Sequence, residues 1–160
     1  EQIRQQELLQ QQASKDELTG LYNRRAWEKL LQAEEERCKQ YGHPAAILFI
    51  DLNDLKKVND NLGHKEGDQL IQHTAQVLQE NVRSNDIVAR IGGDEFVILS
   101  IENDKAGAER LLDRLIEAFA EAKIEAAFGM AMRHPMTGLV EAQWQADKNM
   151  FEYKRWKKSI

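Results

Sequence analysis

The fold of this chain is decided by one stretch, Asp86-Ile87-Val88-Ala89-Arg90-Ile91-Gly92-Gly93-Asp94-Glu95-Phe96-Val97-Ile98-Leu99. β-Branched residues flank a Gly-Gly pair, and a two-residue hairpin turn needs positive φ at both of its central positions. The pattern therefore predicts two antiparallel strands joined by a tight turn at Gly92-Gly93. Successive strand residues point to opposite faces, so at least one of Asp94 and Glu95 stays open to a cation. An ordinary solvated hairpin tip explains the same residues, and the rest of the chain decides between the two interpretations.

Length and composition favour a single globular domain. The chain has 160 residues, of which 42% are hydrophobic, enough for one full core and too few for two comfortable domains. Its formal net charge of -5 argues against a general nucleic-acid or anionic-membrane surface. Cys38 is the only cysteine, so no disulfide framework is expected, and a packing role in a reducing compartment fits.

We expect a cytoplasmic domain that makes no membrane contact of its own. No apolar run approaches the length of about 18 residues that spans a bilayer, and no signal peptide is present. The chain starts at Glu1 without a methionine, which indicates a piece of a longer protein. An upstream sensory domain, with or without a membrane anchor, is therefore expected.

Residues 1–15 predict a polar linker helix, separate from the domain of residues 16–160. The segment is rich in Gln and Glu and contains neither Gly nor Pro. Such a helix buries too little apolar surface alone, so it is either a solvated tail or a dimerisation segment that pairs with a second copy.

Hydrophobic periodicity predicts an α/β (α+β) fold in which helices cover a mixed central β-sheet. An unbroken apolar run at 45–50 indicates a strand buried on both faces. The hairpin and a stretch at 125–132 supply the other strands. Helical spacing predicts helices at about 24–40, 54–61, 66–82, 105–119 and 141–157, of which the first is capped by Asn23 and the second is stopped by Gly63. This order gives a sandwich whose sheet is antiparallel at the hairpin.

A second acidic point follows the buried strand at Asp51. A carboxylate there costs desolvation unless it is paired or binds a cation, although capping of the next helix is the structural alternative. The first turn of that helix, at Asn53 to Leu55, offers free N–H groups to an anion, and Lys56 lies close by. Carboxylates without His or Cys suit Mg²⁺ or Mn²⁺ together with substrate phosphates. Asp51 and the Asp94-Glu95 pair thus favour phosphoryl or nucleotidyl transfer.

Four motifs agree in order and spacing with those of one known family. They are Asp16-Glu17-Leu18-Thr19-Gly20-Leu21-Tyr22-Asn23-Arg24-Arg25, Asp51-Leu52-Asn53-Asp54-Leu55-Lys56-Lys57-Val58-Asn59-Asp60, Gly63-His64-Lys65-Glu66-Gly67-Asp68 and Arg90-Ile91-Gly92-Gly93-Asp94-Glu95-Phe96. On these residues the chain is identified as a member of the GGDEF domain family, the catalytic domains of bacterial diguanylate cyclases. The resemblance covers about Asp16 to Lys158.

The resemblance implies a complete reaction. Two GTP molecules form cyclic di-GMP and release two pyrophosphates, and each 3′-hydroxyl attacks the α-phosphate of the other GTP. One domain binds one GTP, so the active unit implied is an antiparallel homodimer with Mg²⁺ or Mn²⁺, two per active site. The implied fold is a ferredoxin-like palm, similar to adenylyl cyclases and polymerases.

The resemblance also implies roles for single residues. Metal binding falls to Asp51, the Leu52 carbonyl, Asp94 and Glu95, and Asp94 also helps to deprotonate the 3′-hydroxyl with Glu95 in the same acidic pair. Guanine is read by Asn59 and Asp68. The rest of the GTP contacts are assigned to Gly92, Gly93, Lys56, Lys154, Lys158 and the backbone of Asn53, Asp54 and Leu55.

A regulatory site is implied just upstream of the hairpin. Arg83-Ser84-Asn85-Asp86 matches the family's RxxD site for inhibition by cyclic di-GMP, with five residues between Asp86 and Gly92. Arg83 can bind a product phosphate or the guanine edge, and Asp86 can accept from guanine N–H groups. The structural alternative is a plain helix-to-strand connection.

The sequence departs from the family pattern in three places. Asn53 stands where many members have a second Asp, Ala127-Phe128-Gly129 replaces a usual Ser-Ile-Gly, and the C-terminal motif lacks the usual Gly before and Asn after Lys158. An active cyclase remains the favoured interpretation. The alternatives are a catalytically silent receptor for GTP or cyclic di-GMP and a dimerisation module.

Overall fold

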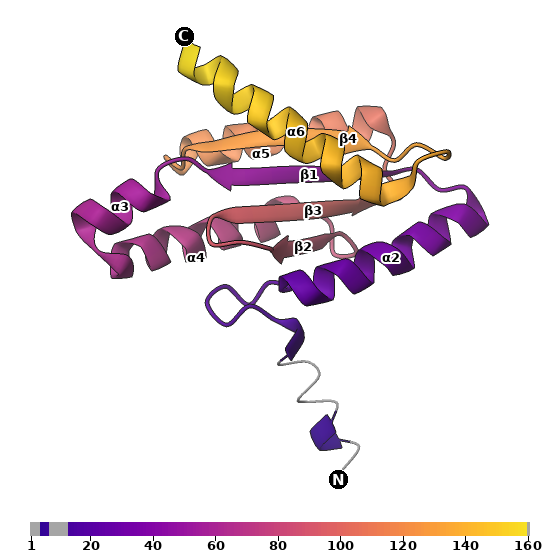
Figure 1. Cartoon of the computed structure of the whole chain (residues 1–160), viewed down its shortest axis with the longest axis horizontal. Helices are drawn as coiled ribbons and strands as arrows, with labels where there is room; N and C mark the ends of the chain where they lie inside the picture. Colours follow the sequence, from indigo (N-terminus) through magenta and orange to yellow (C-terminus); the bar gives the residue numbers. More distant parts are fainter. Residues whose placement is uncertain (1–3, 7–12, 160) are drawn as a thin grey trace.

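The computed structural model describes residues 4–6 and 13–159 of the chain (Figure 1). Of the predicted linker helix at 1–15, residues 4–6 and 13–14 are helical, and the other residues before 13 lie outside the described part. Among the described residues, no helix has both the length and the apolar character needed to cross a membrane.

The core of the fold is a four-stranded sheet in the order β2-β3-β1-β4. Its strands are β1 (Ala45–Leu52), β2 (Ile87–Arg90), β3 (Glu95–Ile101) and β4 (Ala126–Met132). All three strand pairings are antiparallel. β1 and β2 run in the same direction, but β3 lies between them, so the only parallel pairing within residues 4–6 and 13–159 is an isolated bridge from Tyr22 to Ala89. The predicted α/β class is therefore confirmed, with a sheet that is more uniformly antiparallel than expected.

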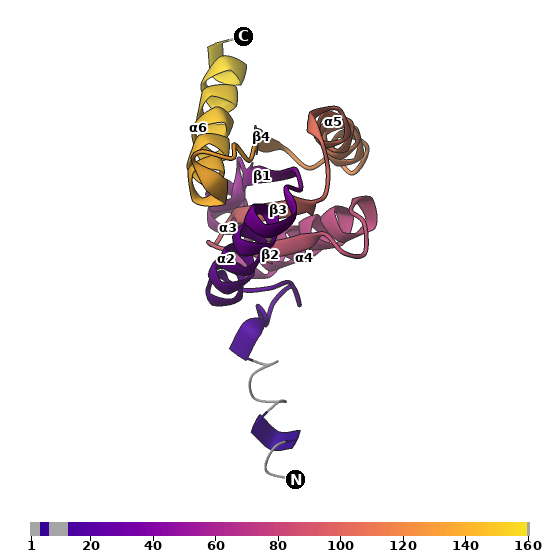
Figure 2. The same ribbon diagram turned by 90° about the vertical axis from the view of Figure 1, so that its right-hand side faces the viewer.

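Helices cover both faces of this sheet. α2 (Arg24–Tyr41) and α6 (Gly138–Ser159) lie on one face, and α4 (His64–Asn81) and α5 (Lys105–Glu121) lie on the other, while the short α3 (Leu55–Leu62) follows β1 (Figures 1 and 2). Side chains of β1 alternate between the two layers, because Ile47 and Phe49 join the core under α2 and α6, and Leu48 and Ile50 join the core under α4 and α5. β1 is thus buried on both faces, as its unbroken apolar run predicted.

The helix boundaries follow the capping signals in the sequence. Asn23 caps α2 by accepting a hydrogen bond from the Ala26 N–H, and Gly42 ends the helix with a positive φ of 73°. Gly63 separates α3 from α4, as predicted. α6 begins at Gly138, three residues before its predicted start at Glu141.

The tight two-residue turn predicted at Gly92-Gly93 is wrong, although the hairpin itself is confirmed. β2 ends at Arg90 and β3 begins at Glu95, so four residues connect them, and neither glycine has a positive φ. Hydrogen bonds other than those that pair β2 with β3 hold this wider loop in place. The Arg90 guanidinium donates to the Gly93 carbonyl at 2.9 and 3.2 Å, and the Leu52 N–H of β1 donates to the Asp94 carbonyl at 3.0 Å.

One buried ion pair joins α2 to both ends of the β4–α6 connection. The Glu35 carboxylate accepts hydrogen bonds from Arg133 Nε at 2.8 Å and Nη2 at 2.9 Å, and from the Leu139 N–H at 2.8 Å. The two side chains are only 15% and 5% exposed. The Arg133 hydrogen bonds hold the pKa of Glu35 below its usual value, against the opposing effect of burial. This pair therefore fixes the start of α6 relative to the sheet.

We predict that Glu35→Gln lowers the free energy of unfolding by about 3 kcal/mol at pH 7, because it leaves the Arg133 charge buried without a carboxylate. Denaturant unfolding measures the change. Glu36→Gln is the matched control, since Glu36 on the same helix forms only an exposed ion pair with Lys39.

The ion pair between Glu35 and Arg133 also makes the stability of the fold depend on pH. Folding lowers the pKa of Glu35, so its stabilisation is fully present above the ordinary glutamate pKa of about 4.3 and is lost as the pH falls through the folded-state value. The stability gap between the parent and Glu35→Gln should therefore shrink below about pH 4. A gap that stays constant down to pH 3 would show that the carboxylate charge is not what stabilises this junction.

Candidate active site

Three acidic residues, Asp51, Asp94 and Glu95, lie at the same end of the two central strands β1 and β3. Asp51 lies near the carboxyl end of β1, and Glu95 is the first residue of β3 and pairs with it across the ladder. Asp94 directly precedes β3, where its carbonyl is bound by the Leu52 N–H. The structure thus brings together the two acidic points that the sequence predicted separately, and both belong to adjacent central strands.

The carboxylates of this cluster are poorly compensated. The Asp51 side chain is 14% exposed, and its Oδ1 atom is buried without a hydrogen-bond partner. Burial, followed by repulsion from Asp94, raises the pKa of Asp51 to about 6. Burial also raises the pKa of Glu95, with further contributions from Asp94 and Asp147. An arrangement of this kind favours an added cation.

A divalent cation fits this donor set. Carboxylate and carbonyl oxygens without His or Cys are the ligands that Mg²⁺ and Mn²⁺ prefer. In the described residues, no three acidic, His or Cys side chains already converge on one point as a finished metal cluster. The unpartnered Oδ1 of Asp51 offers one free ligand, and phosphate oxygens of a substrate can complete the coordination.

A cavity of about 430 Å³ opens beside Asp51. It brings the C-terminal part of α6 together with the loop after β1 and the start of β4, and its lining residues are Asn53, Asp54, Glu125, Ala127, Tyr153, Lys154, Lys157 and Lys158. Lys154 and Lys158, which were predicted to contact phosphates, both line this cavity. Tyr153 and Lys157 were not predicted, although Lys157 stands within the basic C-terminal cluster that the sequence displayed.

The start of α3 differs from the predicted anion site. The Asn53 N–H already donates to the Glu125 carbonyl at 3.1 Å, so it is not free for a phosphate in this structure. Asn53 Oδ1 is buried without a partner, and Asp54 occupies the N-cap position without a side-chain capping bond. Lys56 is exposed and does not line the cavity, while Leu55 is buried. Asn53 and Asp54 therefore reach the cavity, and Lys56 is left outside it.

The two predicted guanine readers lie on neighbouring helices. Asn59 is on α3, and Asp68 is near the start of α4. Gly67 permits their proximity, because a Cβ atom at this position would lie 1.7 Å from Asn59 Oδ1. The amide of Asn59 therefore sits directly against the residue before Asp68, and neither residue lines the cavity beside Asp51.

The predicted regulatory residues Arg83 and Asp86 form a local hydrogen-bonded unit. The Asp86 side chain is 1% exposed and accepts from the Arg83 N–H at 3.0 Å, the Arg83 guanidinium and the Ile101 N–H at 3.1 Å. Arg83 also donates to the Ile101 carbonyl, yet its side chain remains 47% exposed. Both residues line a cavity of about 240 Å³. Asp86 thus has a structural role here, and Arg83 is the accessible member of the pair.

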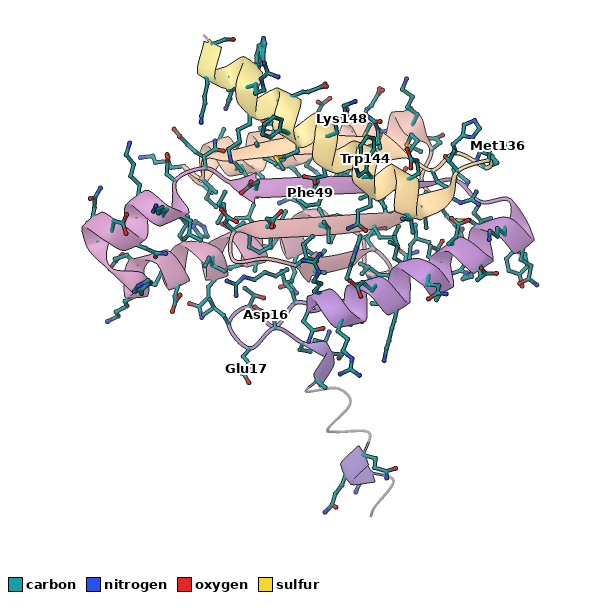
Figure 3. The ribbon with its side chains drawn as sticks, viewed as in Figure 1. Asp16, Glu17, Phe49, Met136, Trp144 and Lys148 are labelled. Atoms are coloured by element: carbon teal, nitrogen blue, oxygen red, sulfur yellow. The ribbon has the colours of Figure 1, made fainter. Side chains whose placement is uncertain are left out.

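A further positioning contact was missed by sequence reasoning. Asp16, in the loop before α2 (Figure 3), forms an ion pair with Arg90 at 3.2 Å, and the same guanidinium holds the Gly93 carbonyl. Asp16 in turn accepts from the Thr19 N–H and hydroxyl at 3.0 and 2.7 Å. Because the two partners are 74 positions apart, local pattern could not connect them. The hairpin loop that carries Asp94 is therefore tied to the entry of the chain into the domain.

Close packing of α6 on β4 sets the position of the lysines. A Cβ atom at Gly129 would lie 2.0 Å from the Ala146 carbonyl oxygen and 2.3 Å from the Met150 backbone nitrogen. Only glycine permits this approach. Lys154 follows Met150 by one helical turn, and its Nζ lies 3.4 Å from Asp51 Oδ2.

Comparison with known proteins gives a consistent result. A family model described as "Diguanylate cyclase, GGDEF domain" matches residues 13–159. The probable diguanylate cyclase DgcC of Escherichia coli (strain K12) is 40% identical over 91 residues, which cover 57% of this chain and 24% of that protein. The cyclic di-GMP phosphodiesterase NbdA of Pseudomonas aeruginosa is 38% identical over 113 residues, which cover 71% of this chain and 14% of that protein.

A solved structure supports the same assignment. The GGDEF domain of DgcB from Caulobacter crescentus, in complex with c-di-GMP, superposes with a TM-score of 0.83 at 25% identity, over 89% of this chain and 91% of that chain. The chain spans only about a quarter of DgcC and a seventh of NbdA. The match therefore concerns one domain of those longer proteins.

We predict that Gly129→Ala displaces α6 from the sheet, because the new methyl group meets backbone atoms that cannot rotate away. Unfolding free energy should fall by about 1–3 kcal/mol, and the contact from Lys154 to Asp51 should be lost in a crystal structure. Gly93→Ala is the matched control, since a Cβ atom there meets nothing within 4 Å. Equal stability of the two variants would contradict the tight β4–α6 contact.

Proposed function

The chain belongs to the GGDEF family of diguanylate cyclase domains, and from this membership we propose that it condenses two GTP molecules into cyclic di-GMP. The observation that supports the proposal best is the cluster of Asp51, Asp94 and Glu95 beside a cavity lined by Lys154, Lys157 and Lys158. Acidic residues for cations next to basic residues for phosphates are what nucleotidyl transfer from a triphosphate requires.

The reaction consists of two equivalent transfers. In each, the 3′-hydroxyl oxygen of one GTP forms a bond to the α-phosphorus of the other, and the bond from that phosphorus to pyrophosphate breaks. We assign Asp94 to accept the hydroxyl proton, with Glu95 as the second acid of the pair. The leaving pyrophosphate gains negative charge, which the lysines of α6 stabilise.

The same acidic residues would hold the cations. We assign Asp51, the Leu52 carbonyl, Asp94 and Glu95 to Mg²⁺ or Mn²⁺, two per active site. When bound, these cations supply activation of the hydroxyl and neutralisation of the triphosphate. The unpartnered Oδ1 atom of Asp51 supports this assignment independently of the family.

The remaining assignments concern GTP itself. Asn59 and Asp68 read the guanine edge, and their approach at Gly67 supports a shared role. The triphosphate contacts are assigned to Asn53, Asp54, Leu55, Lys56, Gly92, Gly93, Lys154 and Lys158, to which the cavity adds Lys157. Because the Asn53 N–H is already bonded to the Glu125 carbonyl, Asn53 donates to a phosphate through its side-chain NH₂ group, or through its N–H after that bond is exchanged.

The active unit we propose is an antiparallel homodimer. One domain holds one GTP, and the product contains two nucleotides, so two copies must present their sites to each other. Both relatives are longer than this chain, whose matched residues cover 24% of DgcC and 14% of NbdA, and an upstream sensory domain in the cytoplasmic parent protein is proposed to control this pairing.

Product inhibition at Arg83 and Asp86 is part of the proposal. Arg83 is accessible beside the cavity of about 240 Å³, and a guanidinium suits a phosphate or a guanine edge. Both Asp86 oxygens already accept hydrogen bonds, so Asp86 orients Arg83 and has to exchange a bond before it can meet a guanine. Bound cyclic di-GMP would then hold domains in an unproductive arrangement.

A second candidate function is a catalytically silent receptor or dimerisation module. The observation in its favour is the match to NbdA, a protein named as a phosphodiesterase, at 38% identity. Intact acidic residues at 51, 94 and 95 favour the cyclase.

We predict that Asp94→Asn lowers cyclic di-GMP synthesis at least about 100-fold, because it removes both a metal-binding charge and the proton acceptor. Chromatography of the products from GTP and Mg²⁺ measures the rate. Asp113→Asn, an exposed aspartate on α5, is the matched control and should retain full activity. Synthesis by folded Asp94→Asn within a few-fold of the parent would refute the assignment.

For product inhibition, we predict that Arg83→Ala keeps the initial rate and loses the early plateau of the progress curve with pyrophosphate removed. Arg114→Ala is the matched control, because Arg114 binds the Asn81 carbonyl at the C-terminal end of α4 at 2.7 Å, close in sequence to Arg83, and does not line the cavity of about 240 Å³. The control should plateau like the parent. If Arg83→Ala plateaus at the same product concentration, Arg83 serves only the helix-to-strand connection.

A further inference from the structure

One cation already occupies the acidic cluster. Lys154 Nζ lies 3.4 Å from Asp51 Oδ2, and the two side chains are 30% and 14% exposed. Among the ion pairs formed within residues 4–6 and 13–159, no other cation lies within 4 Å of Asp51, Asp94 or Glu95. The contact is therefore the one direct neutralisation of this cluster in the described structure.

The position of Lys154 is imposed by the fold. α6 is held against β4 by the close approach at Gly129, and its start is fixed by the ion pair between Glu35 and Arg133. The helix thus carries its ammonium group to a carboxylate 103 positions earlier in the chain. A flexible surface lysine has no such constraint.

We propose that Lys154 is an internal counterion that holds Asp51 while the site lacks metal and nucleotide, and that it leaves Asp51 when a divalent cation binds there. The inference rests on the proposed function and concerns the regulation of the same site. Asp51 Oδ2 lies beside an ammonium group, and a second cation at this carboxylate meets like charge at short range. Binding of a divalent cation therefore competes with Lys154.

The competition couples metal binding to nucleotide binding. Once displaced, Lys154 stays in the wall of the cavity with Lys157 and Lys158, where its ammonium group donates hydrogen bonds to the phosphate oxygens of a triphosphate. Nucleotide thus stabilises the released lysine and favours the cation at Asp51. Thermodynamic linkage requires the reverse effect to be equally large, so metal and nucleotide bind cooperatively.

Titration of Mn²⁺ into the nucleotide-free protein tests the competition between Lys154 and the divalent cation for Asp51. Lys154→Met should bind Mn²⁺ at least about fivefold more tightly than the parent, the lower end of typical coupling between sites. Lys157→Met is the matched control, because it removes a charge from the same cavity without touching Asp51. Lys157→Met should stay within twofold of the parent. Unchanged or weaker Mn²⁺ binding by Lys154→Met overturns the proposal, and so does equal tightening in both variants.

A non-hydrolysable GTP analogue tests the coupling between metal binding and nucleotide binding. In the parent, the analogue should raise Mn²⁺ affinity more than it does in Lys154→Met, and equal enhancement in the two proteins overturns the proposal. Thermal unfolding verifies folding, and Lys154→Gln replaces the Met variant if that variant fails to fold. These Mn²⁺ affinities are measured without any synthesis of cyclic di-GMP. If the protein makes no cyclic di-GMP, the proposed function is refuted, but the counterion role of Lys154 can still be tested.

Discussion

Burial of the Asp51 carboxylate is the constraint on which the active end of this fold depends. β1 is buried on both faces and paired on both edges, so an acid near its end cannot turn fully to water. The neighbouring strand adds Glu95 opposite it, and the hairpin loop adds Asp94. A largely buried carboxylate beside two partly buried ones is unfavourable unless cations compensate the charges. Lys154 supplies part of this compensation through its contact with Asp51.

The compensation comes from α6, and several distant contacts place this helix. Gly129 allows α6 to lie directly on β4, and Glu35 with Arg133 fixes its first turn. The hairpin loop that carries Asp94 is held separately by Arg90, which binds Asp16 and the Gly93 carbonyl. Contacts between residues far apart in the sequence therefore position both α6 and the hairpin loop.

Local pattern predicted the elements of this fold well and their contacts less well. The apolar run of β1, the cap at Asn23 and the stop at Gly63 are signals within a few residues, and the structure confirms them. The hairpin turn was wrong, because Gly-Gly predicts a tight turn only when nothing else holds the loop, and here Arg90 and Leu52 hold a wider one. The pairs Arg90–Asp16 and Lys154–Asp51 join positions 74 and 103 apart, which periodicity cannot connect.

Two largely buried aspartates differ in how completely the fold satisfies their carboxylates. Asp86 is almost fully buried, yet four donors satisfy its two oxygens, so folding has already neutralised its charge. Asp51 is slightly more exposed but keeps one oxygen without a partner and shares the other with a lysine at 3.4 Å. A satisfied carboxylate gains little from a ligand, whereas an incompletely neutralised one gains much. The sequence shows both as aspartates at a strand boundary, and only the surrounding donors distinguish the fully bonded carboxylate of Asp86 from the carboxylate of Asp51, which keeps an oxygen open to a cation.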